Sequence, residues 1–260
     1  MTIRHHFELP DLAGKDLGKE LYRKPPWAIS RQNGSYIYLG ISPQADDPSL
    51  HRVATFTADH TRARIYNDDV RGDSWRKGDL HSLTMFPSDQ ILIARLLADR
   101  RGCYLHSAGA IINGAGVLFV GHSEAGKSTT TNMLIDAGEK GEMDVEILCD
   151  DRNIVRRMDD GWRVYGTWSH GDVPLVSPND APLRAICFIE QANENSITLL
   201  TDRKEITRRL LACVIKPFVT ADWWHKTLDV IGELSNEPDC YLMRFDRSGE
   251  IVGELKKIVG

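Results

Sequence analysis

The sequence lacks an excess of basic charge, a long apolar run and closely spaced cysteines. Its 37 acidic residues outnumber its 32 basic ones, which gives a formal net charge of −5. It contains no basic cluster of about five to eight residues, so broad binding to nucleic acid or to a membrane surface is not expected. No stretch approaches the ~18 apolar residues of a membrane span, and the first residues lack the apolar segment of a secretory signal.

The cysteines are few and scattered, and no two of them form a C-x-x-C pair. There are five: Cys103, Cys149, Cys187, Cys213 and Cys240. An odd, dispersed set favours reduced thiols over disulfides or a zinc site. Together with the missing signal, it predicts a cytoplasmic protein.

The composition is typical of a soluble globular protein, with 42% hydrophobic and 27% charged residues in a chain of 260. We expect a β-rich amino-terminal lobe over residues 1–90 and a catalytic domain over 91–260. The lobe is predicted to begin with an irregular segment, residues 1–34, followed by strands at 35–41, 51–57 and 62–66.

The rest of the chain predicts an α/β fold with a mixed sheet flanked by helices. A helix is expected from an N-cap at Ser88 to a stop at Gly102, with Ile91, Leu92, Ala94, Leu96 and Leu97 buried. Further strands are expected at 104–112, 116–120, 145–149, 183–189, 197–200 and 240–245. Further helices are expected at 129–137, from Thr201 to about Val214, and from Thr220 to about Leu234.

Residues 121–128 match the pattern G-x-x-x-x-G-K-[ST] in full: Gly121, His122, Ser123, Glu124, Ala125, Gly126, Lys127 and Ser128. An apolar strand precedes this phosphate loop, and a helix-compatible run begins at Thr129, which we also assign to the nucleotide-binding site. Such a loop binds phosphate through backbone N–H groups, its lysine reaches the β- and γ-phosphates, and its serine can ligate Mg²⁺. An accidental match is expected roughly once in a hundred chains of this length, so we predict a site for ATP and Mg²⁺.

The loop alone does not distinguish kinases, ATPases and GTPases. The sequence has no N-K-x-D segment for guanine recognition and no L-S-G-G-Q-like signature of an ABC-type ATPase.

Asp150 and Asp151 follow a short apolar strand that we expect beside the strand of the phosphate loop. Ligands bind at the carboxyl ends of such strands. One carboxylate there can hold Mg²⁺ and a second can accept a proton from an attacking hydroxyl. The alternative is an ordinary solvated Asp-Asp turn.

His106 is placed near the phosphates by the predicted hairpin. If Asn113-Gly114 forms the turn, Ile112 pairs with Ala115 and His106 falls opposite Gly121. If the turn lies one residue later, His106 faces Ser123. In either register the imidazole can assist phosphate transfer or influence the acidic pair.

The order of His106, the phosphate loop and Asp150-Asp151 resembles the catalytic domain of the HPr kinase/phosphorylase family, which has a phosphoenolpyruvate-carboxykinase-like fold. Over the whole chain, the sequence is more similar to the short HPr-kinase-related proteins. The resemblance implies transfer of phosphate to a serine hydroxyl, reversible by phosphorolysis. It also implies that Asp150 is the general base and that Asp151 lies near the metal and His106.

Three departures from that family stand out. Glu124 replaces a loop glycine, residues 139–144 resemble an insertion, and residues 1–90 differ from its usual amino-terminal domain. The segment Thr167 to Asp172 is either an acceptor-binding loop or an ordinary turn around a buried tryptophan. Trp223-Trp224 is interpreted as core and surface of one helix.

The sequence therefore predicts a kinase that acts on a serine-type hydroxyl of a protein, peptide or small acceptor. In this hypothesis Asp150, Asp151, His106 and Lys127 are catalytic, and Ser128 and Asp151 hold Mg²⁺. The alternatives are a catalytically inactive nucleotide-binding regulatory module and a carboxykinase-like enzyme for a small organic acid. Neither nucleic acid nor membrane is an expected partner, and the oligomeric state, a homo-oligomer included, stays open.

Overall fold

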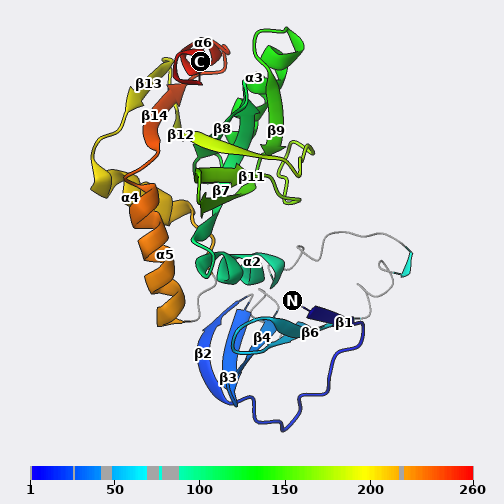
Figure 1. Ribbon diagram of the computed structural model, residues 1–260. Coiled ribbons are helices and arrows are strands. Elements are labelled where there is room, and N and C mark those ends of the chain that lie inside the picture. Colours follow the sequence, from blue (N-terminus) through cyan, green and yellow to red (C-terminus); the bar gives the residue numbers. More distant parts are fainter. Residues whose placement is uncertain are drawn as a thin grey trace. The chain divides into compact units, whose positions relative to one another are not determined.

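The computed structural model (Figure 1) describes residues 2–25, 27–41, 49–68, 76–77, 88–216 and 220–259. The side chains of residues 88–91 lie outside this description, and with them the predicted N-cap side chain of Ser88 and the predicted burial of Ile91. The described residues form a strand-rich mixed α/β protein with one six-stranded sheet, one eight-stranded sheet and five helices. The chain divides into two compact units, one of residues 1–96 with 217–221 and one of residues 97–216 with 222–260.

The first unit is a sheet with the strand order β1-β6-β5-β4-β3-β2. Its strands are β1 (Thr2–His6), β2 (Lys19–Lys24), β3 (Trp27–Gln32), β4 (Ser35–Ile41), β5 (Leu50–Phe56) and β6 (Arg62–Asn67). The prediction of an irregular segment over residues 1–34 is wrong, because β1, β2 and β3 lie there. In β3 four consecutive residues are buried, so the strand shows no alternation of polar and apolar positions.

Both faces of this sheet carry apolar residues. One face packs around Ile29, Tyr38 and Phe56, together with Leu92 of helix α2 (Ser88–Ala98). The other packs around Ile37, Leu39 and Val53, which Leu9, Leu12 and Leu17 partly cover. The predicted helix after residue 87 is present, and its Leu92, Ala94 and Leu97 are buried as expected. It ends at Ala98, four residues before Gly102.

The second unit has the strand order β11-β10-β7-β8-β12-β14-β13, with β9 also paired to β7. Its strands are β7 (Gly102–Ile112), β8 (Ala115–Val120), β9 (Val145–Cys149), β10 (Arg152–Met158), β11 (Gly161–Tyr165), β12 (Asp180–Gln191), β13 (Ser196–Leu199) and β14 (Asp239–Phe245). Strands β8, β12 and β14 are parallel, and the other pairs are antiparallel.

The β7–β8 hairpin has the first of the two registers that the sequence left open. Asn113 and Gly114 both have positive φ, at 50° and 80°, and the pairs run from Ile112–Ala115 to Ser107–Val120. Two residues with positive φ are what a type I′ turn requires. His106 is the next residue of β7 beyond the Ser107–Val120 pair. It therefore lies beside the carboxyl end of β8, where the phosphate loop begins.

The expectation that β9 lies beside the strand of the phosphate loop is wrong. Strand β9 pairs with β7, while β8 has β7 on one side and β12 on the other. The long β7 separates them, because its eleven residues pair with β8 on one edge and with β9 and β10 on the other. Since β8 and β9 are both antiparallel to β7, they run in the same direction. Their carboxyl ends therefore still meet at one edge of the sheet.

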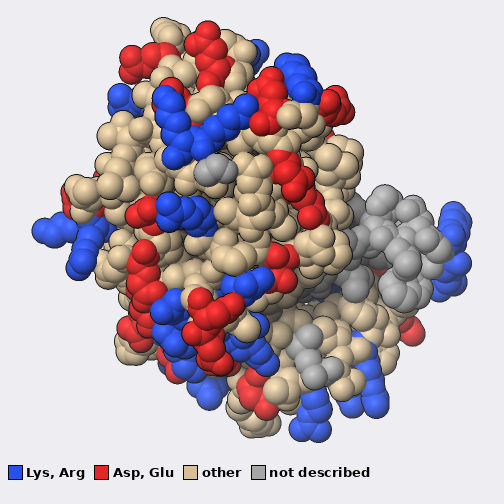
Figure 2. Space-filling view, turned by 45° about the horizontal axis from the view of Figure 1, so that its top comes forward, with Lys and Arg blue, Asp and Glu red and all other residues tan. Residues whose placement is uncertain are grey.

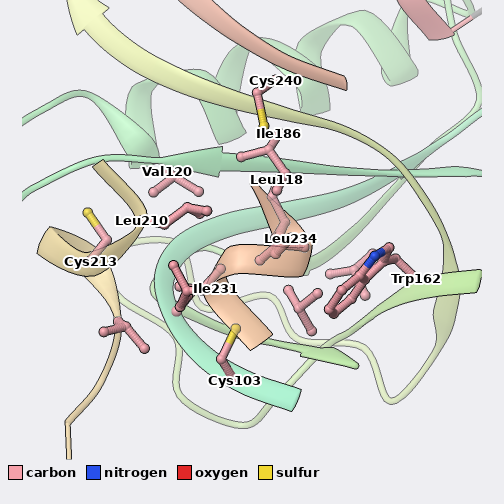
Figure 3. Packing of buried hydrophobic residues seen from close by; sticks show 14 of the residues in the cluster. Cys103, Leu118, Val120, Trp162, Ile186, Leu210, Cys213, Ile231, Leu234 and Cys240 are labelled. Carbon is pink, nitrogen blue, oxygen red and sulfur yellow. The ribbon is translucent and has the colours of Figure 1, made fainter. Parts of the chain in front are cut away.

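Helices cover both faces of this second sheet (Figure 1). On one face, α4 (Arg203–Cys213) and α5 (Ala221–Leu234) contribute Leu210, Ile231 and Leu234 to the cluster shown in Figure 3. On the other, α3 (Lys127–Glu139) and α6 (Ile251–Val259) contribute Leu134, Ile251 and Leu255. The N-cap of α4 is Asp202, whose carboxylate accepts from the Lys204 N–H, and not Thr201 as predicted. Helix α6 had no prediction.

The five cysteines are free and buried. Within the described residues, no helix combines the length and the apolar character that crossing a bilayer requires.

Candidate functional site

The phosphate loop joins β8 to α3 at the carboxyl edge of the second sheet. Gly126 has φ of +104°, and a Cβ there would lie 2.7 Å from Cζ of Phe245, so only glycine fits. Gly126 is also the N-cap of α3 and provides no side-chain cap. The first-turn N–H groups of α3 are thus left for an anion, which the positive end of the helix dipole also favours.

Lys127 is folded back over the loop. Its Nζ donates to the carbonyls of Gly121, at 3.3 Å, and His122, at 3.0 Å, and the residue is buried. Burial lowers the pKa of Lys127 from its usual value, although the nearby Asp151 and Asp150 act in the opposite direction. Within the described part of the chain no carboxylate forms an ion pair with it, so an arriving phosphate would supply the missing anion.

Glu124 has φ of +68°, in the left-handed region that favours glycine. Gln191 at the end of β12 holds this backbone by donating from Nε2 to the Glu124 carbonyl, at 2.8 Å. The glutamate lines the pocket of the phosphate loop. Its carboxylate therefore adds negative charge where phosphate oxygens would bind.

Asp150 is 1% exposed, and both of its carboxylate oxygens accept hydrogen bonds. The N–H of Gly171 donates to Oδ1. The N–H of Val173 donates to Oδ2 at 2.9 Å, and the Ser128 hydroxyl donates to the same oxygen at 3.2 Å. Asp150 therefore links the loop after β11 to the phosphate loop.

Asp172 is the site residue that sequence reasoning did not place. Its Oδ2 lies 3.4 Å from the Ser128 hydroxyl oxygen. The segment around it is held along the end of β9: Ser177 N–H donates to the Leu148 carbonyl at 2.9 Å, and the Cys149 thiol donates to the Ser169 carbonyl at 2.9 Å. The only sequence signal was the position of Asp172 in the segment predicted as an acceptor loop or an ordinary turn.

Asp151 points to a second set of partners. Its Oδ1 lies 3.1 Å from Nε2 of His106, and its Oδ2 lies 2.6 Å from a guanidinium nitrogen of Arg152. The same nitrogen of Arg152 donates to the Ser169 hydroxyl at 2.9 Å. Burial alone would raise the pKa of Asp151, but the His106 hydrogen bond and the charge of Arg152 outweigh it and lower that pKa. Asp151 is therefore ionised at neutral pH.

One pocket of about 460 Å³ joins these groups, a volume within the range of small-molecule sites. Most predicted site residues line it: His106, Ser123, Glu124, Gly126, Lys127, Ser128, Thr129, Asp150 and Asp151. Asp172, Gly171 and Gln191 complete the lining. Gly121, His122 and Ala125 belong to the loop but do not line this pocket.

No model of a known protein family matches the chain, and no curated protein matches it. The site is therefore interpreted from its own chemistry.

The chemistry of the donors fits Mg²⁺. Ser128, Asp150 and Asp172 bring one hydroxyl and two carboxylates together. The described residues contain no group of three or more acidic, histidine or cysteine side chains arranged to hold a metal ion alone. Mg²⁺ typically binds through one or two carboxylates and takes its other ligands from phosphates and water. Ser128, one of the predicted metal ligands, lies with Asp150 and Asp172, whereas Asp151, the other, faces His106 and Arg152.

The structure also places several arginine and tryptophan side chains, some at the site and some away from it. Arg152 lies at the site, whereas Arg184, Arg208 and Arg209 pair with carboxylates elsewhere. Trp223 is buried and stacks edge-on against Trp224, as expected for core and surface of one helix. Trp168, on the segment that carries Asp172, is 42% exposed, so it is not the buried tryptophan of an ordinary turn.

Proposed function

We propose that this protein is a Mg²⁺- and ATP-dependent kinase that transfers the γ-phosphoryl group to a serine-type hydroxyl of a protein, peptide or small acceptor. The observation that carries the proposal is the convergence of five groups on one pocket: Lys127, Ser128, Asp150, Asp151 and His106. A phosphate loop with its lysine, a carboxylate near the metal site and a second carboxylate that can act as base are parts that phosphoryl transfer uses, and here the second carboxylate also has a histidine partner. The fold we propose is the HPr kinase/phosphoenolpyruvate-carboxykinase-like type.

The hydrogen bonds favour a different division of roles from the one that the family resemblance implies. Within the described residues, three hydrogen bonds occupy the carboxylate oxygens of Asp150, and the residue is almost fully buried. It is placed to fix Ser128 and the metal side of the site. Asp151 is more exposed, with 19% of its side chain accessible, and it has an imidazole within hydrogen-bond distance. We therefore assign Asp151 the role of base toward the acceptor hydroxyl.

In this mechanism the protein acts mainly by positioning and by neutralising charge. The N–H groups at the start of α3 hold the phosphates, and Lys127 leaves the loop carbonyls to approach the β- and γ-phosphates. Bound Mg²⁺ would be held by Ser128 with Asp150 and Asp172, and would neutralise phosphate charge. The acceptor oxygen forms a bond to the γ-phosphorus while the bond to the β-phosphate oxygen breaks. Asp151 accepts the hydroxyl proton, and His106 stabilises the new charge distribution.

A second candidate function, a nucleotide-binding regulatory module without catalysis, is favoured by Glu124. A carboxylate on the phosphate loop opposes the close approach of a triphosphate, and the left-handed backbone at this residue is strained for a side chain other than glycine.

The test is incubation of the protein with γ-labelled ATP and Mg²⁺ in a cell extract, followed by identification of the labelled species. The kinase proposal predicts label on serine hydroxyls that is lost with Asp151→Asn. Tight binding of Mg·ATP with no labelled acceptor over a wide panel would support the regulatory module. Absence of nucleotide binding would exclude both.

A further inference from the structure

The first unit carries an exposed cluster of arginines on one face of its sheet. Arg4 of β1 and Arg64 of β6 are directly paired positions of two parallel strands, and Arg62 precedes Arg64 by two residues on the same face. Thr55 of β5 is paired with Arg64, so its side chain lies on this face as well. The three arginines surround a hollow of about 440 Å³ on the sheet. We call Arg4, Arg62 and Arg64 the arginine face.

The charges of the arginine face are not neutralised by acidic side chains of the described residues. Among the residues that the structure describes, no carboxylate forms an ion pair with Arg4, Arg62 or Arg64, whereas Arg23 of β2, in the same sheet, pairs with Glu20. On the side of the molecule that Figure 2 shows, acidic and basic side chains are interspersed over much of the surface. Neighbouring strands lie only ~4.8 Å apart, and like charges on directly paired positions are destabilising. A protein with a net charge of −5 thus keeps three mutually repelling cations together.

The spacing of these cations indicates the shape of the anion. Residues two apart on a strand are ~6.6 Å apart along it, which sets the separation of Arg62 and Arg64. An extended peptide places alternate side chains on one face at the same interval. Acidic side chains at every second position would therefore meet Arg62 and Arg64 in register, with Arg4 reinforcing the second contact. Guanidinium groups bind carboxylates through two parallel hydrogen bonds, and a nearby threonine hydroxyl adds a further polar group.

We infer that the arginine face is a docking surface for an extended acidic peptide segment with carboxylates at alternate positions. A peptide is favoured over a nucleic acid because, among the described residues, Phe56 is the only aromatic one that lines the hollow, and it is 2% exposed. Single strands are bound through stacking on exposed aromatic rings. This inference does not depend on the proposed phosphotransfer, since the surface is formed wholly within the first unit.

The test is fluorescence anisotropy with the full-length protein and no nucleotide. The probe is a labelled peptide with glutamate at every second position, and the comparison peptide has the same composition with the glutamates in adjacent pairs. We expect binding that weakens as salt is raised and is at least about threefold weaker for the comparison peptide. The double variant Arg62→Gln/Arg64→Gln should lose about tenfold in affinity, which corresponds to about 1.4 kcal/mol shared between two exposed charged contacts.

The matched control is Arg31→Gln. Arg31 belongs to the same sheet and is exposed, but it pairs with Tyr36 and lies on the opposite face; it should bind the probe like the wild type. Equal binding by wild type and double variant, or no binding, would overturn the inference. So would stronger competition by an oligonucleotide, inorganic phosphate or anionic vesicles than by the unlabelled peptide.

A second readout separates docking from a structural role of the arginines. If the charges only repel one another in the free protein, Arg4→Gln/Arg64→Gln should melt at the same temperature as the wild type or higher. A lower melting temperature would mean that the arginines stabilise the sheet, and would contradict the inference.

Discussion

Asp150→Asn should cost the protein more stability than Asp151→Asn does. Asp151→Asn should act mainly on phosphate transfer. In Asp150→Asn, one side-chain oxygen can still accept from Gly171, but the new NH₂ group faces the Val173 N–H, which is a donor, and the Ser128 hydroxyl loses this acceptor. A lost hydrogen bond to a charged group costs ~1.5–3 kcal/mol, and a buried donor without a partner costs ~1–3 kcal/mol. We therefore expect a loss of about 3 kcal/mol, or roughly 6–12 °C in the melting temperature of a unit of this size.

Asp151→Asn should be milder for the fold. The partly exposed ion pair of Asp151 with Arg152 is worth at most about 1 kcal/mol, which corresponds to roughly 2–4 °C or less. Asp151→Asn should keep Mg²⁺-dependent nucleotide binding and lose phosphate transfer. Asp150→Asn should lose the dependence of nucleotide affinity on Mg²⁺.

Thermal melting followed by circular dichroism, and calorimetric titration of ATP with and without Mg²⁺, measure the two effects. The reasoning is refuted if Asp151→Asn melts below Asp150→Asn, or if Asp150→Asn binds Mg·ATP as the wild type does.

Three further predictions concern the same pocket. Lys127→Met should weaken ATP binding by roughly 10–100-fold through loss of a charge-assisted hydrogen bond. Because burial lowers the pKa of Lys127, the ammonium is less favourable in the folded state, and the nucleotide-free variant should melt no lower than the wild type. Glu124→Gly should relieve about 1 kcal/mol of left-handed strain, offset in part by the entropy of glycine, and tighten ATP binding about fivefold, which titration measures. Since the pKa of Asp151 is lowered on folding, its contribution to stability is full above the ordinary value of about 4 and is lost as pH falls through the lowered pKa. Denaturant unfolding of wild type and Asp151→Asn should therefore differ at pH 7 and converge at low pH; a difference that does not shrink would contradict the assignment.

Local rules predicted the parts of the site that are short-range. The phosphate loop follows from its own eight residues, and the β7–β8 register follows from the Asn113-Gly114 turn, whose two residues accept positive φ. Strand β9 was predicted with its observed bounds because it is an apolar run that leads directly into the aspartates. These features need no knowledge of distant segments.

Long-range packing decided what the sequence could not show. Strand β9 pairs with β7 instead of β8 because β7 is long enough to carry two partners on its far edge, which no local pattern records. Asp172 reaches Ser128 only because the Asp150 carboxylate holds the N–H groups of Gly171 and Val173. In the first unit, β3 is buried on both faces and so lacks the alternation by which strands are recognised.

The central claim is that Asp150 helps to hold the metal ion of a triphosphate bound on the phosphate loop, while Asp151 acts as the base toward the acceptor hydroxyl. Electron paramagnetic resonance of Mn²⁺ with a non-hydrolysable ATP analogue tests it most directly. We predict a bound-Mn²⁺ spectrum that requires nucleotide, persists in Asp151→Asn and disappears in Asp150→Asn. A spectrum unchanged by Asp150→Asn, or one lost only in Asp151→Asn, would contradict the account.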